Sequence, residues 1–143
     1  MKPFKYILVV LAMITISSCK SELEIISAIK ETIIPGAPTA ESYVQYIIRF
    51  KNLNEEVVEI NNVDLPGSNL QKEDITFGML KMDTRESVSK IESKGEYELI
   101  IRPNQSENII SDENNKVVIT YTINSIESKI TINSFEKKTT RRR

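Results

Sequence analysis

The stretch Val117-Val118-Ile119-Thr120-Tyr121-Thr122-Ile123 carries the strongest fold signal of the chain. Its large apolar side chains fall on every second residue, with threonines and Val118 between them. This period of two indicates a β-strand with one buried face, because successive side chains of a strand point to opposite faces. The polar clusters on either side, at Ser111–Asn115 and Asn124–Ser128, predict turns.

The same alternation recurs along the chain. From Tyr43 to Lys51, one face is apolar and the other polar, and a partner strand is predicted over Val57–Leu65, with a bulge at Asn61-Asn62 where the apolar phase changes. Further strands are expected over three segments: Glu24–Pro35, Glu96–Arg102 and Lys129–Phe135. The predicted core faces comprise Val44, Tyr46, Ile48, Phe50, Leu99, Ile101, Val117, Ile119, Tyr121 and Ile123.

Residues 70–93 give the weakest pattern. Ile75, Phe77 and Met79 predict a short strand that Gly78 interrupts. Residues 84–93 are polar and predict an exposed loop or one helical turn. In all, about seven strands separated by turn signals predict an all-β, antiparallel sandwich or barrel.

Two neighbouring motifs narrow this prediction. Tyr46-x-Ile48-x-Phe50-x-Asn52, followed by Glu56-x-Val58-x-Ile60, resembles strands B and C of the immunoglobulin-like sandwiches of bacterial envelope proteins. The resemblance covers about residues 24–135 and implies an antiparallel immunoglobulin-like sandwich of about seven strands. The cysteine pair and the tryptophan of true immunoglobulin domains are absent from the sequence.

The N-terminus has the layout of a secretory signal peptide. A basic start, Met1–Lys5, precedes the apolar run Tyr6–Ile16 and the small pair Ser17-Ser18, and then comes Cys19, the only cysteine. This order resembles the lipobox of bacterial lipoproteins, which implies that Cys19 is acylated and that the chain is cut before it. A retained membrane span is disfavoured because the run is shorter than the roughly 20 residues needed. A signal cut elsewhere would leave a free thiol in an oxidising compartment.

The lipoprotein resemblance also suggests a location. Lys20 stands where an aspartate would mark inner-membrane retention, so the resemblance favours the outer membrane. The residues after the cysteine, Lys20–Glu24, resemble the export tether of surface-exposed lipoproteins; a solvated linker is the alternative interpretation. The predicted organisation is a signal peptide (1–18), lipidated cysteine and tether (19–23), β-sandwich domain (24–135) and basic tail (136–143).

Composition restricts the function. Without residues 1–18, the chain keeps 125 residues, 17 basic and 20 acidic, for a net charge of −3, which argues against nucleic-acid binding. Because it has no histidine, and no cysteine after Cys19, it lacks a histidine base, a thiol nucleophile and the usual zinc ligands. We therefore expect no enzyme, no catalytic residue, no cofactor and no metal, and Cys19 as the one modified site.

Three acidic clusters offer alternative functions. Glu55-Glu56, Glu96 with Glu98, and Asp112-Glu113 could serve a carboxylate-dependent glycan hydrolase, but read more simply as turns or solvent-facing positions. Asp112–Asn115 offers oxygen ligands for calcium but lacks the order of an EF-hand, and a hairpin turn explains it better.

The basic residues of 136–143 form the one charge run. We expect a solvated tail that can be deleted without harm to the fold; contact with anionic headgroups is the alternative. The function expected from the sequence is a lipid-anchored, non-catalytic binding or structural module at the outer membrane. It would contact the membrane through its lipid, and another envelope protein or a glycan. An accessory subunit of a secretion or transport machine is the other alternative.

Overall fold

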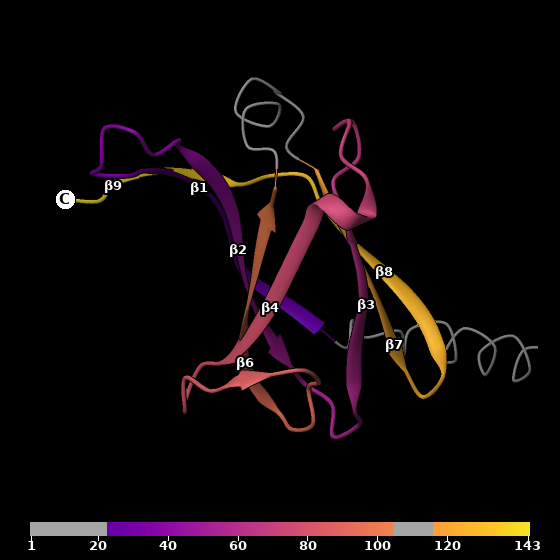
Figure 1. The fold of residues 1–143 in the computed structure, drawn as a ribbon. Coiled ribbons are helices and arrows are strands. Elements are labelled where there is room, and N and C mark those ends of the chain that lie inside the picture. The colour runs from indigo at the N-terminus through magenta and orange to yellow at the C-terminus, as the bar shows by residue number, and fades with distance from the viewer. Residues whose placement is uncertain (1–22, 105–115) are drawn as a thin grey trace, which may run out of the picture.

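The computed structural model describes residues 23–104 and 116–143, which form two β-sheets (Figure 1). The predicted all-β sandwich is confirmed: apart from one 3-10 turn, η1 (Lys72–Asp74), every element of the described residues is a strand. The strands are β1 (Leu23–Ile34), β2 (Tyr43–Asn52), β3 (Val58–Asp64), β4 (Ile75–Lys81), β5 (Ser87–Val88), β6 (Gly95–Pro103), β7 (Val117–Ile123), β8 (Ile126–Ile132) and β9 (Glu136–Arg141).

The larger sheet has the strand order β5-β4-β6-β2-β1-β9, and the smaller sheet has the order β3-β7-β8. All neighbouring strands are antiparallel except β1 and β9, which run parallel. The chain changes sheet between β2 and β3 and again after β3, β6 and β8. Residues far apart in sequence are therefore brought together, since β1 lies between β2 and β9.

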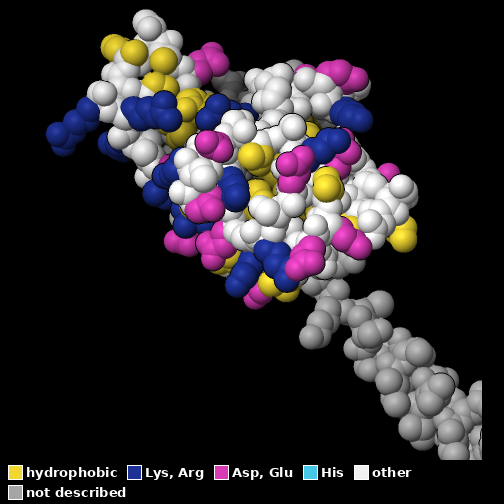
Figure 2. Space-filling model, turned by 90° about the horizontal axis from the view of Figure 1, so that it is seen from below, with side chains coloured by type: hydrophobic (Ala, Val, Ile, Leu, Met, Phe, Trp, Pro, Cys, Tyr) yellow, Lys and Arg dark blue, Asp and Glu magenta, His cyan; other side chains and the backbone are white. Residues whose placement is uncertain are grey.

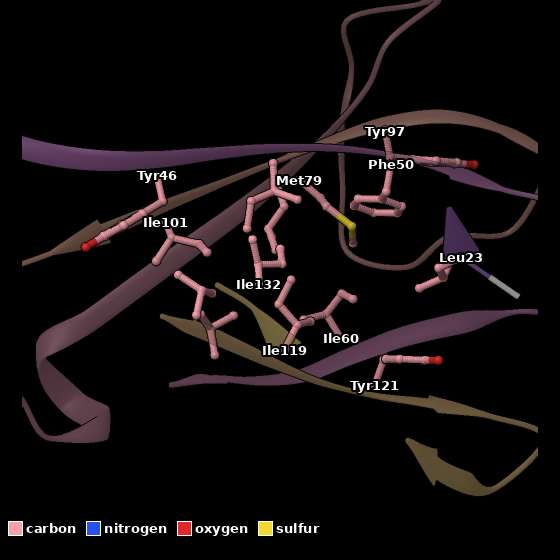
Figure 3. Packing of buried hydrophobic residues seen from close by; sticks show 14 of the residues in the cluster. Leu23, Tyr46, Phe50, Ile60, Met79, Tyr97, Ile101, Ile119, Tyr121 and Ile132 are labelled. Atoms are coloured by element: carbon pink, nitrogen blue, oxygen red, sulfur yellow. The ribbon is translucent and has the colours of Figure 1, made fainter. Parts of the chain in front are cut away.

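The core lies between the two sheets. In Figure 3, Phe50, Met79 and Ile101 of the larger sheet point toward Ile60 and Ile119 of the smaller one. The rings of Phe50 and Tyr97 stack at 5.9 Å between centroids. Every predicted core residue is buried: Val44, Tyr46, Ile48, Phe50, Leu99, Ile101, Val117, Ile119, Tyr121 and Ile123. The period-two prediction is confirmed for β2, β6 and β7, because each of these strands buries its predicted apolar face.

Two irregularities explain breaks in the alternation. The register of β3 against β7 shifts between Ile60 and Asn62, which confirms the bulge predicted at the asparagine pair. The register of β1 against β2 shifts between Ile25 and Ser27, and Ile26 is 48% exposed there. The extra residue in each strand lets the apolar side chains after it return to the core face.

The turn predicted over Asn124–Ser128 is shorter than expected. Asn124 and Ser125 alone make it, with φ values of 51° and 63°, and β8 begins at Ile126. Two successive residues with positive φ form the tight hairpin whose twist matches that of the flanking strands. The turn predicted at Ser111–Asn115 lies outside the described residues.

Residues 70–93 contain more structure than the sequence indicates. The predicted strand at Ile75–Met79 is present as β4, and it runs through Gly78 without interruption. The prediction of a loop or helical turn over 84–93 is wrong in part, because this segment forms β5 and then an isolated bridge. There Ile91 exchanges two backbone hydrogen bonds of 2.9 Å with Val58, and its side chain is fully buried. A lone apolar residue has no periodicity, so its burial could not be predicted.

The largest correction concerns the C-terminal residues. The sequence predicts a solvated tail over 136–143, but Glu136–Arg141 is β9, paired in parallel with β1 from Ile29 to Ile34. The prediction failed because β9 carries no buried apolar side chain, and hydrophobic patterning detects only strands that bury one. Backbone hydrogen bonds and polar side-chain contacts hold this strand instead.

Candidate binding surfaces

The strand β9 gives the molecule a basic end. We define the basic arm as residues 136–143 with the stretches of β1 and β2 beside them, 29–34 and 43–47, which extend from one end of the sandwich (Figure 1). Residues 136–143 contain five basic residues and one acidic residue, while the other described residues contain 11 basic and 15 acidic ones. Figure 2 shows dark blue side chains at the tip of the arm, and magenta and dark blue side chains interspersed over the body. The charge of the fold is therefore polarised along β1.

A row of polar side chains crosses the outer face of the larger sheet at the base of the arm. Thr140 Oγ1 donates to Glu31 Oε1 at 2.6 Å, and Gln45 Nε2 donates to Glu31 Oε2 at 2.6 Å. Arg102 Nε donates in turn to Gln45 Oε1 at 3.2 Å. Each contact joins two neighbouring strands, so the row links β9, β1, β2 and β6 in order. It fixes β9 to the sheet without any apolar contact.

Glu31 is the centre of this row. It is 7% exposed, and both of its carboxylate oxygens accept a hydrogen bond. The hydrogen bond from Thr140, that from Gln45 and the positive charges of Lys138 and Arg142 lower the pKa of Glu31 below its ordinary value of 4.5, although burial acts in the opposite direction. The carboxylate is therefore held ionised among the cations of the arm.

The ends of β9 are also fixed. Before the strand, the ring of Phe135 packs edge-on against Tyr46 at 5.2 Å, and Lys30 Nζ lies 5.8 Å from the centre of the same Tyr46 ring. After it, the Arg142 N–H donates to the Ile34 carbonyl at 2.9 Å. A Cβ at Gly36 would lie 2.6 Å from the Arg142 carbonyl oxygen, so only glycine fits this close approach.

Among the described residues, no strand covers the other edge of β9. The Arg142 backbone faces β1, and successive backbone groups of a strand point to opposite edges. The N–H and C=O groups of Lys137, Thr139 and Arg141 therefore face outward. They form a hydrogen-bonding edge flanked by cationic side chains on both faces of the sheet.

A second surface lies on the outer face of β4, β5 and β6. A shallow hollow of about 310 Å³ is lined by Thr76, Phe77, Gly78, Met79, Leu80, Ser87, Ile100 and Arg102. The space above Gly78 is open, since a Cβ there would meet nothing within 4 Å. By register, Ile100 lies beside Ile47 and Ile47 beside Ile29, so a half-buried isoleucine row continues from the hollow across the sheet. Nothing in the described residues indicates what covers it.

The predicted lipidation site, Cys19, lies outside the described residues, as do Asp112 and Glu113. The other acidic clusters take part in separate contacts. Glu55 lies 3.4 Å from Lys94, Glu56 accepts a hydrogen bond from Asn124, and Glu98 forms an ion pair of 3.0 Å with Arg49. Glu96 lies opposite Lys51 on the neighbouring strand. The structure thus places these carboxylates in cross-strand and turn contacts.

Within residues 23–104 and 116–143, no group of three or more acidic side chains is placed to hold a metal ion. In the same residues no helix has the length and apolarity to cross a bilayer. No protein-family description matches the sequence, and no curated protein or solved structure is significantly similar to it.

The polar row as a whole has no signature in the sequence. Glu31, Gln45 and Arg102 each occupy the polar phase of a strand, which reads as a solvent-facing position. The pair Thr139-Thr140 was the one available signal, because β-branched residues favour strands over disordered tails. The long-range contact between Glu31 and Thr140 has no local signature.

Proposed function

We propose that this chain is a lipid-anchored envelope protein whose β-sandwich is a non-catalytic binding module at the outer membrane. The observation that carries the binding function is the ordered basic arm, which concentrates a net charge of +4 in 136–143. A solvated tail makes no regular contacts with the fold. Residues 136–141, in contrast, pair with β1, and Thr140 bonds to the buried carboxylate of Glu31. The arm therefore carries its cations on an ordered strand.

The fold supports the same proposal. The strand order β4-β6-β2-β1 with β3-β7-β8 supports the immunoglobulin-like part of the proposal, since constant-type immunoglobulin domains have the order D-E-B-A with C-F-G; β5 and β9 lie at the edges of the larger sheet. Sandwiches of this kind present loops and edge strands to partners, although fold alone does not assign a function. In this reading β9 is an addition that extends the larger sheet beside β1.

The anchor rests on the sequence around Cys19. The basic start, the apolar run and the small pair before the cysteine support acylation at its thiol and cleavage before it. Stable membrane attachment takes more than one acyl chain, which is the modification that the lipobox resemblance implies.

A Cys19→Ala variant tests the anchor. It is expected to lose acyl labelling and either to leave the membrane fraction or to accumulate as uncleaved precursor. Ser18→Ala is the matched control, since it keeps a small residue before the cysteine and is expected to be processed normally. A Cys19→Ala chain that is cleaved normally and still sediments with membranes would contradict the lipoprotein assignment.

A further inference from the structure

We infer that the open edge of β9 is a docking site for an extended, acidic protein segment, which adds to the larger sheet as a further strand. This inference rests on the proposed binding function and specifies its ligand and its mode. The juxtaposition that carries it is an unpaired strand edge with cationic side chains on both faces.

The backbone supplies the first half of the site. Lys137, Thr139 and Arg141 direct their N–H and C=O groups away from β1, and no described strand meets them. An added strand gains affinity from main-chain hydrogen bonds of this kind, and specificity from the side chains beside them. Three outward residues in β9 suit a segment of about five to seven residues in extended form.

The side chains supply the second half. Lys137 and Arg141 lie on one face of the sheet, and Lys138 and Arg142 lie on the other, because residues two apart share a face. A segment with acidic residues would place carboxylates opposite these cations on either face. Opposite charges across neighbouring strands stabilise a pair, and like charges destabilise it.

Charge also disfavours an alternative ligand for this edge, namely β9 of a second molecule of the same protein. Two β9 strands would bring Lys and Arg side chains together, and edge lysines are a common protection against such pairing. The arm therefore rejects self-association while it accepts an acidic strand. The arm contains two acidic residues, Glu31 and Glu136, but six basic ones, so it keeps a net positive charge.

The position of the edge favours a protein segment over the membrane that holds the lipid. β9 pairs with Ile29–Ile34, while the described chain begins at Leu23. At about 3.3 Å per residue, the C-terminal end of β1 lies roughly 36 Å from its start. Under the proposed anchoring, a lipid on Cys19 holds the Leu23 end close to the bilayer, and the arm lies at the other end of the strand.

The test uses the full chain in neutral detergent and a fluorescent octapeptide of alternating glutamate and valine, read by anisotropy. The matched probe is the same peptide with glutamine in place of glutamate. We expect the acidic peptide to bind at least tenfold more tightly than the glutamine peptide at low salt. The difference should shrink with added salt, which screens surface charge.

Thr139→Pro separates strand addition from simple charge attraction. The Thr139 N–H faces outward, so proline removes a donor from the open edge and leaves the ladder to β1 and every cation in place. We expect peptide affinity to fall at least tenfold. Lys137→Glu with Arg141→Glu should abolish binding, and Lys90→Glu with Lys94→Glu, on the body of the domain, should not change it.

Hydrogen exchange of the unmodified chain gives a second readout if Thr139→Pro disturbs the fold. Saturating acidic peptide should slow exchange at the amides of Lys137, Thr139 and Arg141. Unchanged exchange at these amides, or equal binding of the glutamine peptide, would overturn the inference. Failure of peptide binding, together with flotation of the detergent-free chain with anionic but not with neutral vesicles, would identify a lipid surface as the ligand. Acylation at Cys19 enters none of these measurements, so failure here is distinct from failure of the anchor.

Discussion

Thr140 and Glu31 are 109 residues apart in sequence, yet the Thr140 hydroxyl donates a 2.6 Å hydrogen bond to the Glu31 carboxylate. This contact joins β9 to β1. It also supplies the largest contribution to the lowered pKa of Glu31.

The lowered pKa predicts a pH dependence of stability. The folded state prefers ionised Glu31, so its contribution is fully present above the ordinary pKa of 4.5 and is lost as the pH falls through the lowered value. Glu31→Gln should be less stable than the unmodified chain at pH 7, and the gap should narrow toward pH 3. Urea unfolding at both pH values measures it. Glu127→Gln, at an exposed position of β8, is the control and should show no such gap.

Deletion of residues 136–143 should destabilise the fold, contrary to the expectation from the sequence. It removes the ladder to β1 and the Thr140 partner of a buried carboxylate. A hydrogen bond to a charged group contributes about 1.5–3 kcal/mol, and the free energy of unfolding should fall by at least this amount. The urea midpoint measures the change. An unaltered midpoint would mean that β9 adds nothing to the stability of the sandwich.

Two glycines provide a matched pair. Gly36→Ala would push a Cβ against the Arg142 carbonyl oxygen, whereas Gly78→Ala meets nothing within 4 Å. Gly36→Ala should displace the end of β9 and cost about 1–3 kcal/mol, as overpacking does. Gly78→Ala should have little effect on unfolding. Similar losses for the two variants would show that the close approach at Gly36 is not maintained in solution.

Ile91 tests the part of the core that lacks a sequence signature. Its side chain is fully buried and its backbone bridges to Val58, so Ile91→Ala should cost about 2–5 kcal/mol. Val57→Ala, at a residue 49% exposed, should cost far less. Thermal or urea unfolding distinguishes them. Equal losses would place Ile91 outside the core.

The register of β7 gives a further check. Ile119 is 3% exposed in the core, and Val118 points to the other face of the sheet. Ile119→Ala should lose about 2–5 kcal/mol of unfolding free energy, and Val118→Ala much less. The reverse order in urea unfolding would mean that the strand is shifted by one residue.

The parts of the fold that follow from the sequence are those that bury one apolar face. β2 and β7 were predicted from the alternation of Tyr46, Ile48 and Phe50 and of Ile119 and Tyr121, because burial requires side chains of one kind on one face. The bulge at Asn61 was visible for the same reason, since the apolar phase changes there.

The candidate site could not be predicted in this way. β9 buries none of its side chains, and its stability depends on a partner strand more than a hundred residues earlier. The polarity of Lys137 and Lys138 correctly predicts that their side chains are exposed to solvent. Exposed side chains do not exclude an ordered backbone, however, and both residues lie in β9. Hydrogen bonding across a long sequence separation leaves no pattern within either segment.

The parallel pairing of β1 with β9 affects the order in which the fold can be completed. A nascent chain emerges with its N-terminus first, so β1 and β2 can pair as a hairpin while the edge of β1 from Ile29 to Ile34 still has no neighbour. That edge is closed only after β9 has been synthesised, and contacts between distant residues are slow to form. Until then it is a template for pairing with other chains. Ribosomes that stall or terminate before codon 136 would therefore release a nearly complete sandwich with an aggregation-prone edge.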